Sequence, residues 1–170
     1  MSAASDMKLF CEAILHFDGD GLKKFNFSRA DLYKMWTKSF VEAIEANVKS
    51  AFTKNHASKI GDAIISALKK VAIDTKDLSE GKVEVTITGL NVGSIFADTN
   101  WQLDVNPDAG KEEIVDSVIR AVEKKFDALQ PVKTTVFVID CGYSEGSKNW
   151  QPLNMDDFMP KLFAGALGNR

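Results

Sequence analysis

The spacing of the apolar residues changes once along this chain, and that change constrains the fold more than any other feature. Up to about residue 73, apolar residues recur three and four positions apart, which is the spacing of one face of a helix. From residue 83 to residue 88 apolar and polar residues alternate, which is the spacing of a strand with one wet face. The pattern therefore predicts a helical part over about residues 1–75 and an α/β part over about residues 76–170.

The helical part divides into a short and a long stretch. A one-sided helix is expected at 5–16, ended by the glycine-rich turn at 18–21. The stretch at 29–73 carries a first stripe that recurs every four residues and so winds around a helix of 3.6 residues per turn. Its members are Leu32, Trp36, Phe40, Ile44, Val48 and Phe52. A helix of about 45 residues far exceeds the usual length, so we expect a break near 54–57.

The α/β part predicts a sheet packed with helices. We expect strands at 83–88, 101–105 and 134–141, helices at 107–129 and 154–167, and a possible extra strand at 25–27. The strand at 134–141 is apolar on both faces, which is typical of a central strand covered on both sides. A strand, helix, strand crossover predicts that it runs parallel to an earlier strand. The expected fold is a single α+β domain, 1–170, with a small mixed sheet of three or four strands.

Composition narrows the classes of protein that this chain can represent. Its 170 residues fit one domain, and 45% apolar residues are enough for a packed core. A net charge of −3 argues against nucleic-acid binding, which needs a basic surface. The sequence lacks a signal-peptide pattern at its start and a run of about 18 apolar residues, so we expect no membrane partner. Two cysteines, Cys11 and Cys141, predict buried free thiols and a cytoplasmic location.

One string resembles the motif around a hydrolase serine. Gly142-Tyr143-Ser144-Glu145-Gly146 has the G-x-S-x-G spacing and follows a strong strand. A nucleophile elbow must lead into a helix, whereas loop-forming residues follow here at 147–152. Both histidines, His16 and His56, lie far upstream. The string is therefore predicted to be a turn that leaves the sheet, and we expect no catalytic residue in it.

Asp140 is the more informative polar residue. It ends a strand predicted to be buried, at the position where open α/β sheets carry ligand-binding and catalytic groups. Ser144 and Cys141 lie beside it in sequence. The alternative is that Asp140 caps backbone N–H groups of the following turn. A small ligand-binding site or an active site at this sheet edge, with Asp140 and Ser144 as possible ligand-binding residues, thus remains one hypothesis.

Motifs for metals and cofactors fail on their spacing. The acidic turn at 18–21 lacks the later ligands of a calcium loop, with Leu22 at its fifth position and Arg29 at its twelfth. The glycine-rich stretch at 89–94 lacks the lysine of a phosphate loop. The cysteines and histidines show no paired zinc-ligand spacing. We expect neither a metal nor a cofactor.

Three aromatic side chains lie in segments predicted to be loops or a short strand. They are Phe96, Trp101 and Trp150, and such residues anchor many protein interfaces. The competing interpretation is that they fill gaps between helices and sheet. We therefore expect a non-enzymatic protein-interaction module of inhibitor, immunity, adaptor or assembly type, whose partner is another protein. Alternatives are the site around Asp140 and a subunit of a larger assembly, and a homo-oligomer is possible.

Overall fold

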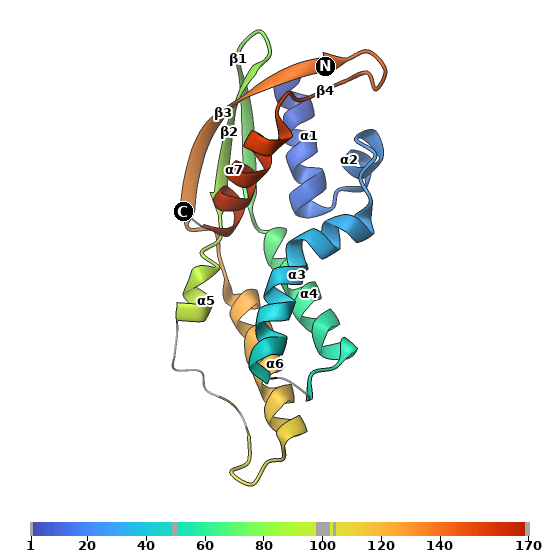
Figure 1. Ribbon diagram of the computed structural model, residues 1–170. Helices are drawn as coiled ribbons and strands as arrows, with labels where there is room; N and C mark the ends of the chain where they lie inside the picture. The colour runs from blue at the N-terminus through green and yellow to red at the C-terminus, as the bar shows by residue number, and fades with distance from the viewer. Residues whose placement is uncertain (1, 49–50, 98–102, 104, 169–170) are drawn as a thin grey trace.

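The computed structural model describes residues 2–48, 51–97, 103 and 105–168 and shows an α+β domain (Figure 1). Over these residues the chain forms seven helices and a four-stranded sheet. In chain order the elements are α1 (Ala3–His16), α2 (Gly19–Lys24), α3 (Arg29–Val48), α4 (Lys54–Leu68), β1 (Ala72–Ser79), β2 (Lys82–Gly89), α5 (Gly93–Ala97), α6 (Lys111–Ala128), β3 (Lys133–Ser144), β4 (Asn149–Pro152) and α7 (Met155–Leu167). The predicted fold class and helical first part are confirmed.

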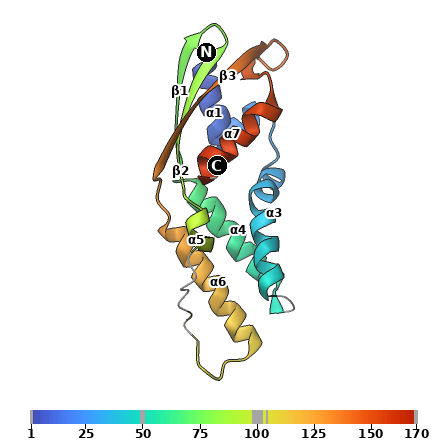
Figure 2. The same cartoon turned by 60° about the vertical axis from the view of Figure 1, so that its left-hand side comes forward.

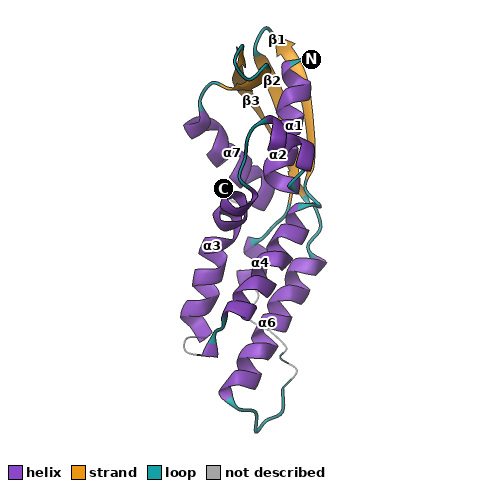
Figure 3. Ribbon diagram, turned by 90° about the vertical axis from the view of Figure 1, so that its right-hand side faces the viewer, coloured by secondary structure: helices purple, strands orange, loops and turns teal. Residues whose placement is uncertain are grey.

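The molecule is elongated, with the sheet at one end and a helical layer at the other. Helices α1 and α7 lie on the same side of the sheet (Figures 1 and 2). Beyond the end of the sheet, α3 and α6 both pack against α4 (Figure 3). The core runs through both halves, because α4 and α6 bury their apolar stripes below the sheet while α1 and α7 bury theirs against it.

All neighbouring strands pair antiparallel, in the order β1-β2-β3-β4. The predicted parallel pairing of the strand at 134–141 is therefore wrong. The chain leaves the sheet at Gly89 and re-enters at Lys133, which is the partner of Gly89 in the ladder. Helices α5 and α6 thus form an excursion beyond one end of the sheet instead of crossing its face. The crossover rule does not apply to such a connection.

Strand β3 has an interior position but only one covered face. It lies between β2 and β4, as a central strand should. On its inward face Ile139 is buried and Phe137 packs against the core. On its other face Val136 and Val138 are 55% and 43% exposed. The prediction of a strand covered on both sides is therefore wrong, since α1 and α7 supply a single layer.

Side-chain caps set the helix boundaries. Thr53 is the N-cap of α4 and forms a capping box with His56, so the break after α3 comes slightly earlier than the predicted 54–57. Asp18 caps α2, which makes the predicted acidic turn the start of a short helix. Asn154 caps α7 at the start of the predicted range 154–167, and Gly168 ends the helix with a φ of 73°.

Several elements differ from the sequence prediction. Strands β1 and β4 and helix α5 arise where turns and loops were expected, and residues 25–27 form no strand. Helix α6 begins at Lys111, four residues after the predicted start at 107. The predicted strand at 101–105 lies largely outside the described residues, and Trp101 lies outside them as well.

Both cysteines are buried free thiols, as predicted. Cys11 lies in α1 and Cys141 on the inward side of β3. Burial raises the pKa of the Cys141 thiol to about 11, and it raises the pKa of the Cys11 thiol further still. Both thiols are therefore protonated at neutral pH.

Candidate functional site

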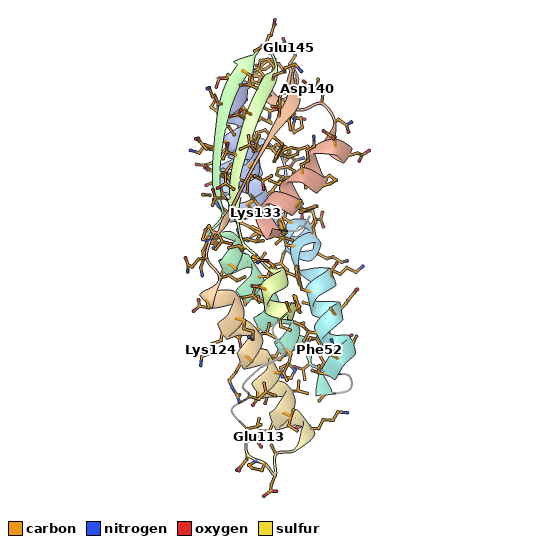
Figure 4. All side chains as sticks on the ribbon, turned by 90° about the vertical axis from the view of Figure 1, so that its left-hand side faces the viewer. Phe52, Glu113, Lys124, Lys133, Asp140 and Glu145 are labelled. Carbon is orange, nitrogen blue, oxygen red and sulfur yellow. The ribbon has the colours of Figure 1, made fainter. Side chains whose placement is uncertain are left out.

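The side of the sheet that faces away from α1 and α7 is the candidate site, and we name it the outer face. In Figure 4 the β1–β2 ribbon lies in front of α1, so this face is turned toward the viewer. The ladder places its side chains in cross-strand rows. From one end of the sheet to the other the rows are Ala72-Thr88-Thr134, Asp74-Thr86-Val136, Lys76-Glu84-Val138 and Lys82-Asp140.

The outer face combines a short apolar stripe with balanced charges. Val136 and Val138 lie next to each other along β3 and form the stripe. Lys76 lies directly opposite Glu84 on the neighbouring strand, and Lys82 Nζ lies 2.8 Å from Asp140 Oδ1. Thr88 and Thr134 share a hydroxyl hydrogen bond of 3.1 Å. The face is therefore nearly neutral and rich in β-branched residues.

Both edges of the sheet carry features that oppose pairing with another strand. On β1 the carboxylate of Asp74 accepts the N–H of Thr75 at 3.0 Å, and the ladder shifts register between Asp77 and Ser79. On β4, which has four residues, the N–H of Trp150 donates to Asp6 at 2.8 Å. Charged side chains and bulges of this kind protect sheet edges. The outer face is therefore better suited than either edge to contact with another protein surface.

The structure places Asp140 and Ser144 in different settings. The Asp140 side chain is 64% exposed on the outer face, where it pairs with Lys82. Ser144 lies at the end of β3, and its hydroxyl oxygen accepts the N–H of Ser147 at 3.3 Å. Residues 145–148 then form the turn between β3 and β4, which is the loop geometry expected from the sequence.

The predicted aromatic anchors are separated in space. Phe96 in α5 is 45% exposed and stacks on Phe40 of α3, with ring centroids 5.9 Å apart. Trp150 in β4 is half-buried against the core and meets Tyr143 edge to face at 5.6 Å. Neither lies on the outer face.

A buried polar cluster joins the two ends of the chain. The Asp6 side chain is 1% exposed, and its carboxylate accepts from Lys24 Nζ at 2.7 Å as well as from the N–H of Trp150. Asn149, which is fully buried, donates from Nδ2 to the carbonyl of Lys24 at 3.4 Å. Every charge and donor in this cluster is matched, so we interpret it as a structural lock between α1, α2 and β4.

His56 and Asp116 form an acid–histidine pair, with 2.6 Å between Nε2 and Oδ1. His56 Nδ1 accepts the N–H of Thr53 at 3.0 Å. The neutral ring must therefore carry its proton on Nε2 and donate it to Asp116. Nδ1 thus takes part in the cap at the start of α4, and Nε2 ties this end of α4 to α6. This geometry indicates that His56 caps a helix and does not serve as a proton-transfer group.

The hydrogen bond from His56 lowers the pKa of the Asp116 carboxyl below its ordinary value. A carboxyl whose pKa is lower in the folded state stabilises the fold above its unfolded pKa, and this contribution is lost as the pH falls through the folded pKa. Asp116→Asn should therefore lower stability at pH 7 and lower it less at pH 3. Urea unfolding at both pH values measures this, and an equal loss at both would contradict the assignment.

Grooves also lie away from the outer face, and two of them differ clearly in the side chains that line them. One, of about 480 Å³, runs between α4 and α6 and is lined by side chains of both charges, Lys70 and Asp127 among them. The other, of about 390 Å³, is apolar and is lined by three methionines, Met35, Met155 and Met159. Across the described part of the chain, no group of three or more histidine, cysteine and acidic side chains is placed to hold a metal ion.

Comparison with known proteins bears on the fold. No family model matches the sequence, and no curated protein matches it either. The crystal structure of a candidate lipoprotein (ycdA) from Bacillus subtilis subsp. subtilis str. 168 is similar, with a TM-score of 0.69 and 18% identity over 97% of this chain. This is a shared fold. The match spans 56% of the Bacillus chain, so this chain corresponds to about half of that protein.

This structural similarity does not test the predicted cytoplasmic location, which stays a prediction. Among the helices that the structure describes, each is too short or too polar to cross a membrane.

Sequence reasoning missed Val136 and Val138 as surface residues. Their pattern predicted burial, because a strand that is apolar on both faces is typical of a sheet covered on both sides. The described part of the chain supplies one such layer, α1 and α7. The outer side of β3 therefore stays exposed at Val136 and Val138.

Proposed function

We propose that this protein is a non-enzymatic protein-interaction module and that the outer face of its sheet is its main binding surface. The observation that carries the proposal is the exposure of two neighbouring apolar side chains, Val136 and Val138, on the uncovered face of the sheet. Exposed apolar groups that lie together mark interaction surfaces more often than isolated ones do. Because the edge strands β1 and β4 are protected from strand pairing, we expect contact through the outer face. There, side chains of a partner can pack between the β-branched residues.

The chemistry of the face defines the partner. Its lysines lie beside acidic residues on neighbouring strands, so a strongly charged partner would gain little from it. A surface of similar kind, with β-branched residues and few unpaired charges, would bury the valines without leaving a charge unmatched. The partner is thus a protein that presents such a surface, in keeping with sheet-on-sheet packing.

A photo-crosslinking amino acid placed at position 136 tests this proposal in the native cell. The control carries the same group at position 124, where Lys124 is exposed on α6 far from the sheet (Figure 4). We expect a covalent adduct with a protein at position 136 and at least about tenfold less at position 124. Equal labelling at both positions, or none at position 136, would contradict the proposal.

The structure gives the two described aromatic residues different expected roles. Phe96 remains a proposed secondary anchor because it is half-exposed beside Phe40. Trp150 packs against the core, so Trp150→Ala is expected to lower the melting temperature in addition to any effect on binding.

A further inference from the structure

We infer that the outer face binds a second copy of itself, through a two-fold axis that lies across the strands between the Asp74 and Lys76 rows. This inference rests on the proposed function and identifies its partner. The order of side chains along the face supports this arrangement, because a two-fold axis in this position lays each row over the row at the same distance on the other side of the axis.

The two central rows match each other in chemistry. Rotation about the axis places Asp74 of one copy over Lys76 of the other, and Lys76 over Asp74. On β3 the same rotation places Val136 over Val138. Sheets pack about 10 Å apart, a gap that aspartate and lysine side chains span together. The contact therefore has two ion pairs along β1 and an apolar contact between valines along β3.

The remaining rows also avoid conflict. Glu84 of one copy meets Thr86 of the other, and Asp140 meets Thr134, so a hydroxyl faces each carboxylate. Like charges are kept apart in every row. The opposite choice, a two-fold axis along the strands, would lay β1 over β3 and bury Asp74 and Lys76 against valines. The distribution of charge thus selects one of the two arrangements.

The size of the face sets the strength of the contact. Three strands about 4.8 Å apart, each about eight residues long at about 3.3 Å per residue, give roughly 400 Å² per copy. Stable complexes bury about 800 Å² per partner. We therefore expect a weak dimer whose population rises with concentration over the range from about 10 µM to about 1 mM.

Sedimentation of the purified chain with charge-reversal variants tests the arrangement. Asp74→Lys places two lysines over two lysines, and Lys76→Asp places two aspartates over two aspartates. Each variant alone should dissociate at least about tenfold more readily than the wild type. Mixed together, the two variants regain both ion pairs and should associate like the wild type. Lys124→Glu, on α6, is the matched charge reversal that should leave association unchanged.

Melting temperature checks that each variant is folded, and Val136→Lys supplies a second variant if Lys76→Asp unfolds beside Glu84. A wild type that stays monomeric to about 1 mM, or two variants that fail to associate on mixing, would overturn the inference. The crosslinking at position 136 separates the two proposals. An adduct with a different protein keeps the proposed function and removes the second copy, whereas no adduct removes both.

Discussion

Replacing Asp6 with alanine is expected to lower the free energy of unfolding by about 3 kcal/mol, because it removes one partner of a buried charge pair. The Asp6 carboxylate accepts from Lys24 Nζ at 2.7 Å and from the N–H of Trp150 at 2.8 Å. Alanine leaves that N–H without its acceptor beside the core. Lys24 is 19% exposed and can turn toward water, which keeps the loss at the lower end for buried pairs.

A matched control exists on α7. Asp157 accepts from Lys161 at 3.1 Å, and both side chains are about half-exposed. Asp157→Ala should change stability by less than about 0.5 kcal/mol, because exposed pairs contribute little. Chemical denaturation of both variants measures the difference. If both variants lost a similarly small free energy of unfolding, burial of the Asp6–Lys24 pair would not contribute to stability.

Gly89→Ala is expected to cost about 3 kcal/mol or more through overpacking. A Cβ at position 89 would overlap the carbonyl oxygens of Gly165 and Ala166 in α7. These are backbone atoms, so they cannot move aside as a side-chain end can. The adjacent hydrogen bond from Leu90 N–H to the Ala166 carbonyl, at 2.8 Å, holds α7 in place.

Gly146→Ala is the control for this substitution. Position 146 lies in the β3–β4 turn, and a Cβ there would meet nothing within 4 Å. Its effect should stay within about 0.5 kcal/mol, as for other exposed sites. Thermal and urea unfolding of the two variants provide the comparison. If Gly89→Ala proved as stable as Gly146→Ala, the close contact between β2 and α7 would be wrong.

The sequence allowed prediction of the elements whose signals are local. Helix α4 was visible because its apolar residues lie on one side, and α7 was visible because Asn154 and Gly168 mark its ends. Strand β2 was visible through its alternation. In each case the buried face and the polar face differ strongly, so period alone identifies the element.

Strand β1 had no such signal. It contains Asp74, Lys76 and Asp77, which are poor strand residues, and most of it is exposed. It is a strand because β2 offers it a ladder of hydrogen bonds, and α1 holds it through Asp77 and Thr75. Both causes lie in other parts of the chain, so the local sequence predicts a helix up to about residue 73 and a turn after it.

The direction of β3 and the candidate site depended on packing between distant segments. Sequence could not show whether α6 lies over the sheet or beyond its end, because its apolar stripe fits either neighbour, and it packs against α4. That choice makes β3 antiparallel to β2 and leaves Val136 and Val138 without a cover. The strand was predictable, whereas its exposed face was not.

The lock between Asp6 and Trp150 joins positions 144 residues apart, and this separation matters while the protein is being made. At about 5–20 residues per second, a ribosome needs about 7 to 30 s to add those residues. During that time α1 has emerged without β4. The nascent α1, with Met7 and Phe10 on its apolar side, therefore spends that time without the strand that later completes its buried contacts.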